Sequence, residues 1–107
     1  MMGRKDTPRG TANALVDPNF TDAEEFSAKT FLAVKFNELI NMRGLSQTEA
    51  AYITGMTQPK VSQIRRYKLQ NISLERLMQA LVSLDQHVEI IVRPAHRPHT
   101  AGITVAA

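Results

Sequence analysis

The chain has 107 residues, a formal net charge of +3, no cysteine and 43% hydrophobic residues. This composition is ordinary for a globular domain, and the length suits one domain with tails. The absence of cysteine excludes a disulfide framework, a thiolate zinc site and a cysteine nucleophile, and it suits a reducing, cytoplasmic environment. No apolar run approaches the roughly 18 residues that a membrane span needs, so we expect no membrane partner.

The positive charge is concentrated in one part of the chain. Residues 41–68 carry one acidic residue, Glu49, and five basic residues: Arg43, Lys60, Arg65, Arg66 and Lys68. Such a stretch favours a polyanion as partner. On charge alone, a solvated basic face is the simpler interpretation.

The first half of the chain predicts an arm followed by a long helix. Residues 1–19 contain proline, glycine and small polar residues without an apolar period, so we expect a flexible N-terminal arm. Thr21 and Glu24 have the spacing of a capping box, which starts a helix. Its apolar face repeats at helical spacing, and Gly44 is suited to end it in the left-handed conformation. The inward positions are Leu32, Phe36, Leu39 and Ile40.

Three shorter helices follow. Ser46 and Glu49 form a second capping box, and the helix that they start ends at Gly55. Thr57 caps a third helix that carries a proline in its first turn, where the missing amide proton costs little. Ser73 caps a fourth helix, and the leucines at 74, 77, 81 and 84 point inward. The sequence therefore predicts a mainly α domain over residues 20–86.

The period changes from helical to alternating after residue 86. Residues 87–94 read as a β-strand in which Val88, Ile90 and Val92 share one face. A lone strand is not stable, so we expect it to pair with the same strand of a second copy and form a homodimer. Two alternatives to the homodimer remain: the strand could form a hairpin with residues 103–105, or it could be an unpaired edge strand that binds another protein. We expect residues 95–107 to be a flexible tail.

Residues 47–64 carry the pattern of a helix-turn-helix. Two short helices that cross steeply need a small residue at the crossing, here Ala51, and a residue that tolerates positive φ at the turn, here Gly55. They also need an apolar residue after the turn, Met56, and an apolar inner face on the second helix, Val61 and Ile64. A helical corner that binds nothing is the competing interpretation.

The outer face of the third helix follows from a rotation of 100° per residue. With Val61 and Ile64 inward, the outward and flanking positions suit base contacts in the major groove of DNA, where glutamine pairs with adenine and lysine reaches guanine. These positions are Gln58, Pro59, Lys60, Ser62 and Gln63. Residues suited to hold phosphates are Gln47, Arg65, Arg66 and Lys68.

The sequence resembles a known protein family. The segments GLSQTEAAYITGMTQPKVSQIRRYK and ISLERLMQALVSLDQHVEIIVRP resemble the XRE, lambda-repressor-like helix-turn-helix proteins, and with the upstream TDAEEFSAKTFLAVKFNELINMRG they resemble the HigA-type antitoxin branch. The resemblance covers about residues 12–95. It implies a bundle of four to five helices, a two-fold dimer on double-stranded operator DNA, autorepression, association with the nucleoid, and a RelE/HigB-like toxin as partner. Tyr67 departs from the pattern, because these proteins usually carry glycine there.

Nothing in the sequence predicts an enzyme. No nucleophile stands beside a base, and no paired carboxylates suggest acid–base chemistry. His96 and His99 have Pro98 between them and no carboxylate nearby, so we expect neither a metal nor another cofactor. Two alternatives to the antitoxin remain: a stand-alone XRE-family regulator, and a protein-interaction adaptor that does not bind DNA.

Overall fold

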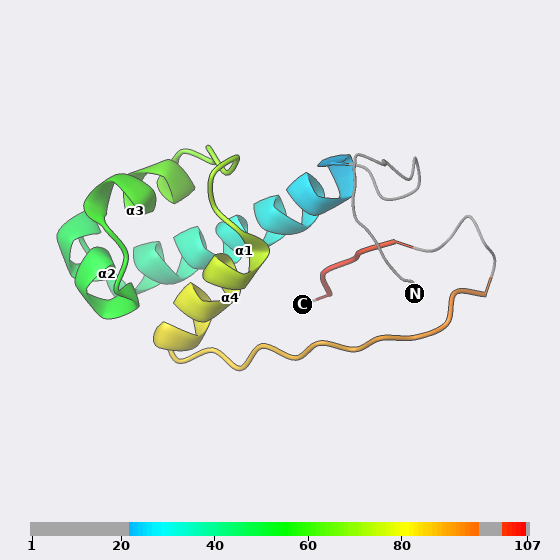
Figure 1. Ribbon diagram of the computed structural model, residues 1–107. Coiled ribbons are helices and arrows are strands. Elements are labelled where there is room, and N and C mark those ends of the chain that lie inside the picture. Colours follow the sequence, from blue (N-terminus) through cyan, green and yellow to red (C-terminus); the bar gives the residue numbers. More distant parts are fainter. Residues whose placement is uncertain (1–21, 97–101, 107) are drawn as a thin grey trace, which may run out of the picture.

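The computed structural model describes residues 22–96 and 102–106. Four helices occupy this part of the chain, namely α1 (Asp22–Arg43), α2 (Gln47–Thr54), α3 (Gln58–Arg65) and α4 (Leu74–Ser83). The predicted mainly α fold with four helices is therefore confirmed (Figure 1). The capping box expected for α1 involves Thr21, which lies outside the described residues.

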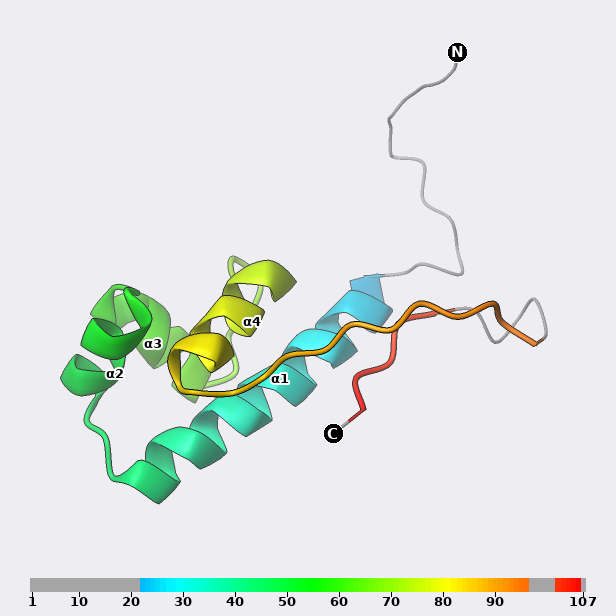
Figure 2. The same ribbon diagram turned by 90° about the horizontal axis from the view of Figure 1, so that it is seen from below.

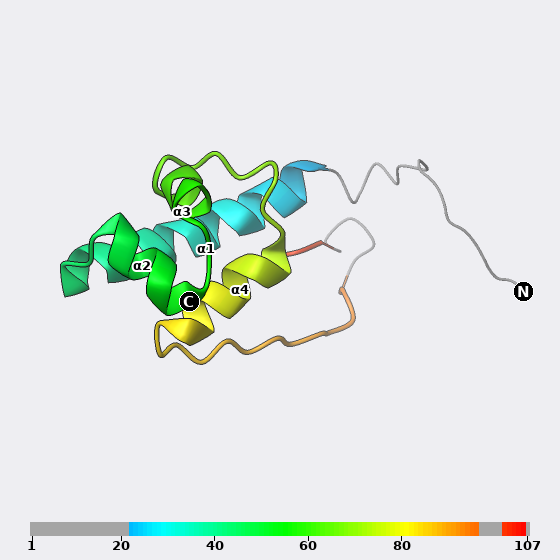
Figure 3. The ribbon, with the colours of Figure 1, turned by 60° about the vertical axis from the view of Figure 1, so that its left-hand side comes forward.

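The helices pack around one apolar core. The long α1 contacts α3 and α4, while α2 contacts α3 and α4, so the two short helices sit together at one end of the bundle (Figures 1 and 3). The largest fully buried side chains come from α1, from α3, from α4 and its end, and from the loop before α4. They are Phe36, Ile40, Val61, Ile64, Leu69, Leu77 and Leu84.

The predicted starts of α2, α3 and α4 are confirmed. The Glu49 amide donates to Ser46 Oγ at 3.0 Å and the Ser46 amide donates to Glu49 Oε1 at 2.8 Å, which completes the capping box of α2. Thr57 accepts from the Lys60 amide at the start of α3, and Ser73 caps α4 in the same way. Each cap satisfies an amide that a helix N-terminus would otherwise leave without a partner.

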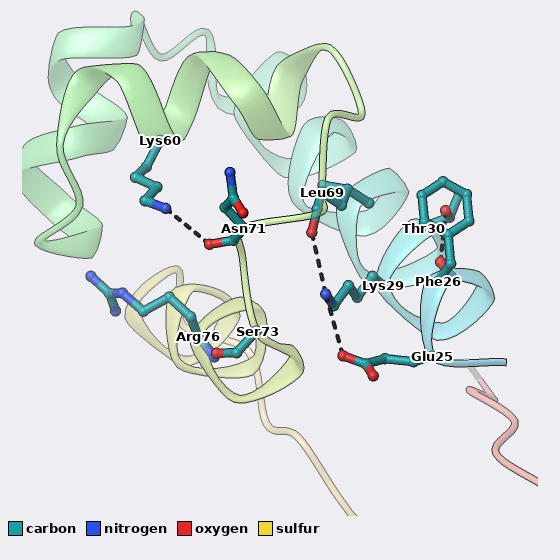
Figure 4. Close-up of polar contacts among 9 residues, drawn as sticks. All are labelled: Glu25, Phe26, Lys29, Thr30, Lys60, Leu69, Asn71, Ser73 and Arg76. Atoms are coloured by element: carbon teal, nitrogen blue, oxygen red, sulfur yellow. Dashed lines mark hydrogen bonds and ion pairs between the residues drawn. The ribbon is translucent and has the colours of Figure 1, made fainter. Parts of the chain in front are cut away.

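Basic side chains tie the helices together through backbone carbonyls. Lys29 Nζ on α1 lies 3.3 Å from the Leu69 carbonyl and 3.3 Å from Glu25 (Figure 4). Arg43 donates to the Leu84 carbonyl at 2.6 Å, and Arg76 donates to the Thr54 carbonyl at 3.3 Å. Both carbonyls lie at helix C-termini, where a cation is favourable. No sequence pattern predicts these long-range pairs.

The C-terminal segment is extended but forms no strand within the described residues. Residues 87–95 run from the end of α4 toward the N-terminal end of α1 without a backbone ladder to any other described segment (Figure 2). The alternative hairpin with residues 103–105 is therefore not formed in this chain. Residues 102–106 lie against the first turn of α1 instead, where the Ile103 amide donates to Glu24 Oε1 at 3.0 Å. Among the helices described, none has the length and apolar character to cross a membrane.

Candidate nucleic-acid interface

The turn between α2 and α3 has the geometry that the sequence predicts. Gly55 ends α2 with φ 72°, a left-handed conformation that glycine adopts without strain. Met56, the next residue, is buried, and Ala51 is buried beside Ala50 on the inner face of α2. Small residues on α2 let the two helices approach closely. The segment is a helix-turn-helix in which α3 occupies the position of a recognition helix.

A buried polar contact holds α3 on α1. The Asn37 side chain is almost fully buried, and its Nδ2 donates to the Ile64 carbonyl at 3.1 Å. Its Oδ1 accepts from Arg65 Nη1 at 3.1 Å, while Arg65 Nη2 donates to Asn41 Oδ1 at 2.8 Å. Because both partners of the amide lie on α3, this contact fixes the position of α3 on α1. The charge pattern predicts Arg65 at a phosphate, and no sequence signal singles out Asn37.

The opposite side of α3 is polar and accessible. Gln58 and Pro59 are exposed, Ser62 and Gln63 are half-buried, and Arg66 is exposed at the C-terminal end. Gln63 Oε1 is buried and has no hydrogen-bond partner among the described residues. A buried amide oxygen without a donor is costly. Rotation of the Gln63 side chain toward a donor outside the chain would remove that cost.

The remaining phosphate candidates flank this surface. Gln47 is exposed at the first residue of α2, where the amides of the N-terminus point outward. Lys68 is exposed two residues beyond Arg66 in the turn after α3. We call the outward surface of Gln47, Gln58, Pro59, Ser62, Gln63, Arg66 and Lys68 the α3 face.

Lys60 lies to one side of the α3 face. Its ammonium donates to the Asn71 carbonyl at 2.9 Å, toward the start of α4 rather than away from the bundle (Figure 4). It lines an open pocket of about 400 Å³ with Arg76 and Ser73. Lys60 would have to leave the Asn71 carbonyl in order to reach a base. Within the described residues, no three His, Asp or Glu side chains gather as metal ligands would.

Comparisons with known proteins agree with this geometry. Residues 14–93 match a family model described as a helix-turn-helix domain. A solved structure whose name assigns it to the XRE family of transcriptional regulators is 48% identical in sequence and superposes with a TM-score of 0.75. The match covers 81% of this chain and 99% of that one. No curated protein matches the chain.

These matches extend well beyond the α2–α3 motif. The family model covers most of the chain, and the relative shares almost half of its residues over its whole length. The chain therefore belongs to the XRE family of helix-turn-helix proteins.

Proposed function

We propose that this protein is a sequence-specific transcriptional repressor that binds operator DNA as a homodimer and serves as the HigA-type antitoxin of a RelE/HigB-like toxin. The main observation in support of DNA binding is the contrast between the two sides of α3. Val61 and Ile64 are fully buried and Asn37 holds the helix from behind. The outward side offers amides, a hydroxyl and cations, which suits the major groove and its flanking phosphates.

Different members of the α3 face have different tasks in this proposal. Gln58 and Gln63 contact adenine, and Pro59 and Ser62 lie against neighbouring base edges. Gln47, Arg66 and Lys68 hold phosphates. Lys60 and Arg65 bind DNA only by giving up their carbonyl and asparagine partners, so we assign them a supporting role. A protein-interaction adaptor would not need this polar surface.

The DNA test separates base contacts from phosphate contacts. Gln58→Ala is expected to lower affinity for the preferred site by about 1–3 kcal/mol and relax preference at one base pair. Arg66→Ala is expected to weaken binding to every duplex and reduce the salt slope by about one unit. Electrophoretic mobility shifts with the DNA upstream of the protein's own gene provide the measurement. A folded wild type that retards no duplex at low salt would contradict the proposal.

The homodimer part rests on the C-terminal segment. Val88 packs against the core of its own chain, whereas Ile90 and Val92 are 71% and 91% exposed. Exposed β-branched residues on an extended segment suit antiparallel pairing with the same segment of a second copy. A two-fold dimer of this kind can place two recognition helices roughly 34 Å apart, on successive major grooves.

Sedimentation tests the dimer. The wild type is expected to be dimeric at tens of micromolar, and Ile90→Asp is expected to be a folded monomer. Arg93→Asp, on the same segment, is the charge control and should remain dimeric, because position 93 faces away from Ile90 in an alternating strand. A monomeric wild type, or a folded and dimeric Ile90→Asp protein, would exclude pairing through residues 87–94.

The toxin partner is supported by the family resemblance. A basic ribonuclease would find acidic residues near the start of α1, where Glu24 and Glu25 lie far from the α3 face in sequence. Co-expression with the product of the adjacent gene is the test. Co-purification and relief of growth arrest are expected, and failure of both would favour the stand-alone regulator.

A further inference from the structure

We propose that Tyr67 contacts DNA, donating a hydrogen bond from its phenol to a backbone phosphate beside the C-terminal end of α3. The inference rests on the proposed DNA binding and adds a residue that sequence analysis noted only as a departure from the family pattern. The phosphate is the ligand because a phenol hydroxyl is one of the groups that proteins use to hold DNA phosphates.

All four helices are followed by a residue with positive φ. These residues are Gly44 at 63°, Gly55 at 72°, Tyr67 at 60° and Asp85 at 66°. The ends of α1, α3 and α4 also share one hydrogen-bond pattern. At α3, the Tyr67 amide donates to the Ile64 carbonyl at 3.1 Å and the Lys68 amide donates to the Gln63 carbonyl at 2.8 Å. This is the Schellman cap, which needs a left-handed residue.

The four positions differ in how well their residues tolerate this conformation. Glycine tolerates it without cost, and the short polar side chain of aspartate tolerates it better than most. A tyrosine in the same conformation is strained, and strained residues of this kind cluster at functional sites. The recognition helix thus ends in the least suitable residue of the four.

The tyrosine does not belong to the hydrophobic core. Tyr67 is 41% exposed, whereas Leu69 and Ile72 in the same loop are fully buried. The turn is held inward by Leu69, whose carbonyl also accepts from Lys29. A glycine at position 67 would keep the same backbone hydrogen bonds without the strain.

The neighbours of Tyr67 indicate what the side chain is for. Arg66, Tyr67 and Lys68 are all exposed, so a guanidinium, a phenol and an ammonium belong to three consecutive exposed residues. All three groups donate hydrogen bonds, and phosphate oxygens only accept them. A recognition helix lies in the major groove, and in the homeodomain variant of the helix-turn-helix the C-terminal end of that helix contacts the DNA backbone.

Tyr67→Phe and Tyr67→Gly test the inference, with Tyr52→Phe as the control. Tyr52 is 88% exposed on α2 and does not belong to the α3 face. Both Tyr67 variants are expected to lose about tenfold in affinity for every duplex, because a hydrogen bond to a charged group is lost. The salt slope should not change, since no charge is removed, whereas Lys68→Ala should flatten it. Tyr67→Gly should also melt at or above the wild-type temperature, because the strain is gone.

Two results would separate the possible failures. If wild type and Tyr52→Phe bind DNA and both Tyr67 variants bind equally well, the inference is overturned while the proposed function stands. If the folded wild type binds no duplex, the proposed function itself fails. Reduced DNA affinity together with a higher melting temperature for Tyr67→Gly supports the inference. If Tyr67 had a purely structural role, the substitution would lower the DNA affinity and the melting temperature together.

Discussion

Local sequence signals predict the structure of the helix-turn-helix correctly, whereas those of the C-terminal segment predict a strand that is not formed among the described residues. In α2 and α3 every short-range signal has its partner within a few residues, and the predicted turn and caps are present. Residues 87–94 have a roughly alternating pattern, yet no strand forms among the described residues. A helix satisfies its backbone within itself, whereas a strand needs a second segment. The comparison is consistent with the proposal that residues 87–94 pair with a second copy of the chain.

The largest expected effect distinguishes the two regions by their contribution to monomer stability. Ile64→Ala removes a fully buried side chain from α3 and is expected to lower the free energy of unfolding by about 2–5 kcal/mol. Ile91→Ala changes a residue that is 61% exposed and is expected to cost less than about 0.5 kcal/mol. The measurement is urea unfolding at a protein concentration too low for the dimer to form. Equal costs would mean that Ile91 is buried within the monomer.

A second prediction concerns the polar contact behind α3. Asn37→Ala removes the donor of a buried hydrogen bond to the Ile64 carbonyl and the acceptor of a part-buried hydrogen bond from Arg65. We expect a loss of about 1–3 kcal/mol in unfolding free energy, because the buried carbonyl is left without this partner. Asn41→Ala, whose amide is exposed, is the matched control and should cost less than Asn37→Ala. The prediction fails if the two variants unfold at the same urea concentration.

A third prediction concerns the cap that starts α2. Ser46→Ala removes the acceptor for the Glu49 amide and is expected to cost about 1 kcal/mol. Ser46→Asp keeps a capping oxygen and should restore most of the loss. Thermal unfolding followed by circular dichroism measures both. A Ser46→Ala protein as stable as wild type would show that packing alone defines this helix start.

The smallest expected effect lies at the end of the chain. A Cβ at Gly102 would clash with the carboxylate of Glu24, so in Gly102→Ala that side chain should move and its contact with the tail should weaken. Because residues 102–106 are mostly exposed, global stability should change by less than about 0.5 kcal/mol. Hydrogen exchange at the Ile103 amide, which donates to Glu24, should become faster. Unchanged exchange would show that this contact does not persist in solution.

Local chemistry accounts for what the sequence could predict. The caps at Ser46, Thr57 and Ser73 and the turn at Gly55 depend on neighbours within four residues, so their residue types identify them. The apolar positions of α1, α3 and α4 follow from helical spacing, and the core confirms them. The α3 face follows from the same rotation, although its contacts with DNA stay predictions.

Contacts between distant segments account for what could not be predicted. Asn37 and Lys29 bind carbonyls 27 and 40 residues away, and every residue has a carbonyl, so no residue type identifies the partner. The same limit applies to Lys60 and Arg65, whose charge is visible in the sequence but whose partners at Asn71 and on α1 are not. The charges alone therefore do not show which cations also make contacts within the fold, and the DNA contacts of Lys60 and Arg65 stay predictions.

The central claim is that the α3 face binds DNA while the C-terminal segment does not. The most direct test is an amide chemical-shift titration of the labelled protein with a duplex taken from upstream of its own gene. We predict shifts at Gln47, Gln58, Ser62, Gln63 and residues 66–68, with residues 87–95 unchanged in a protein that is already dimeric. Shifts confined to residues 87–95 or to the outer side of α1, with α3 unaffected, would contradict the claim.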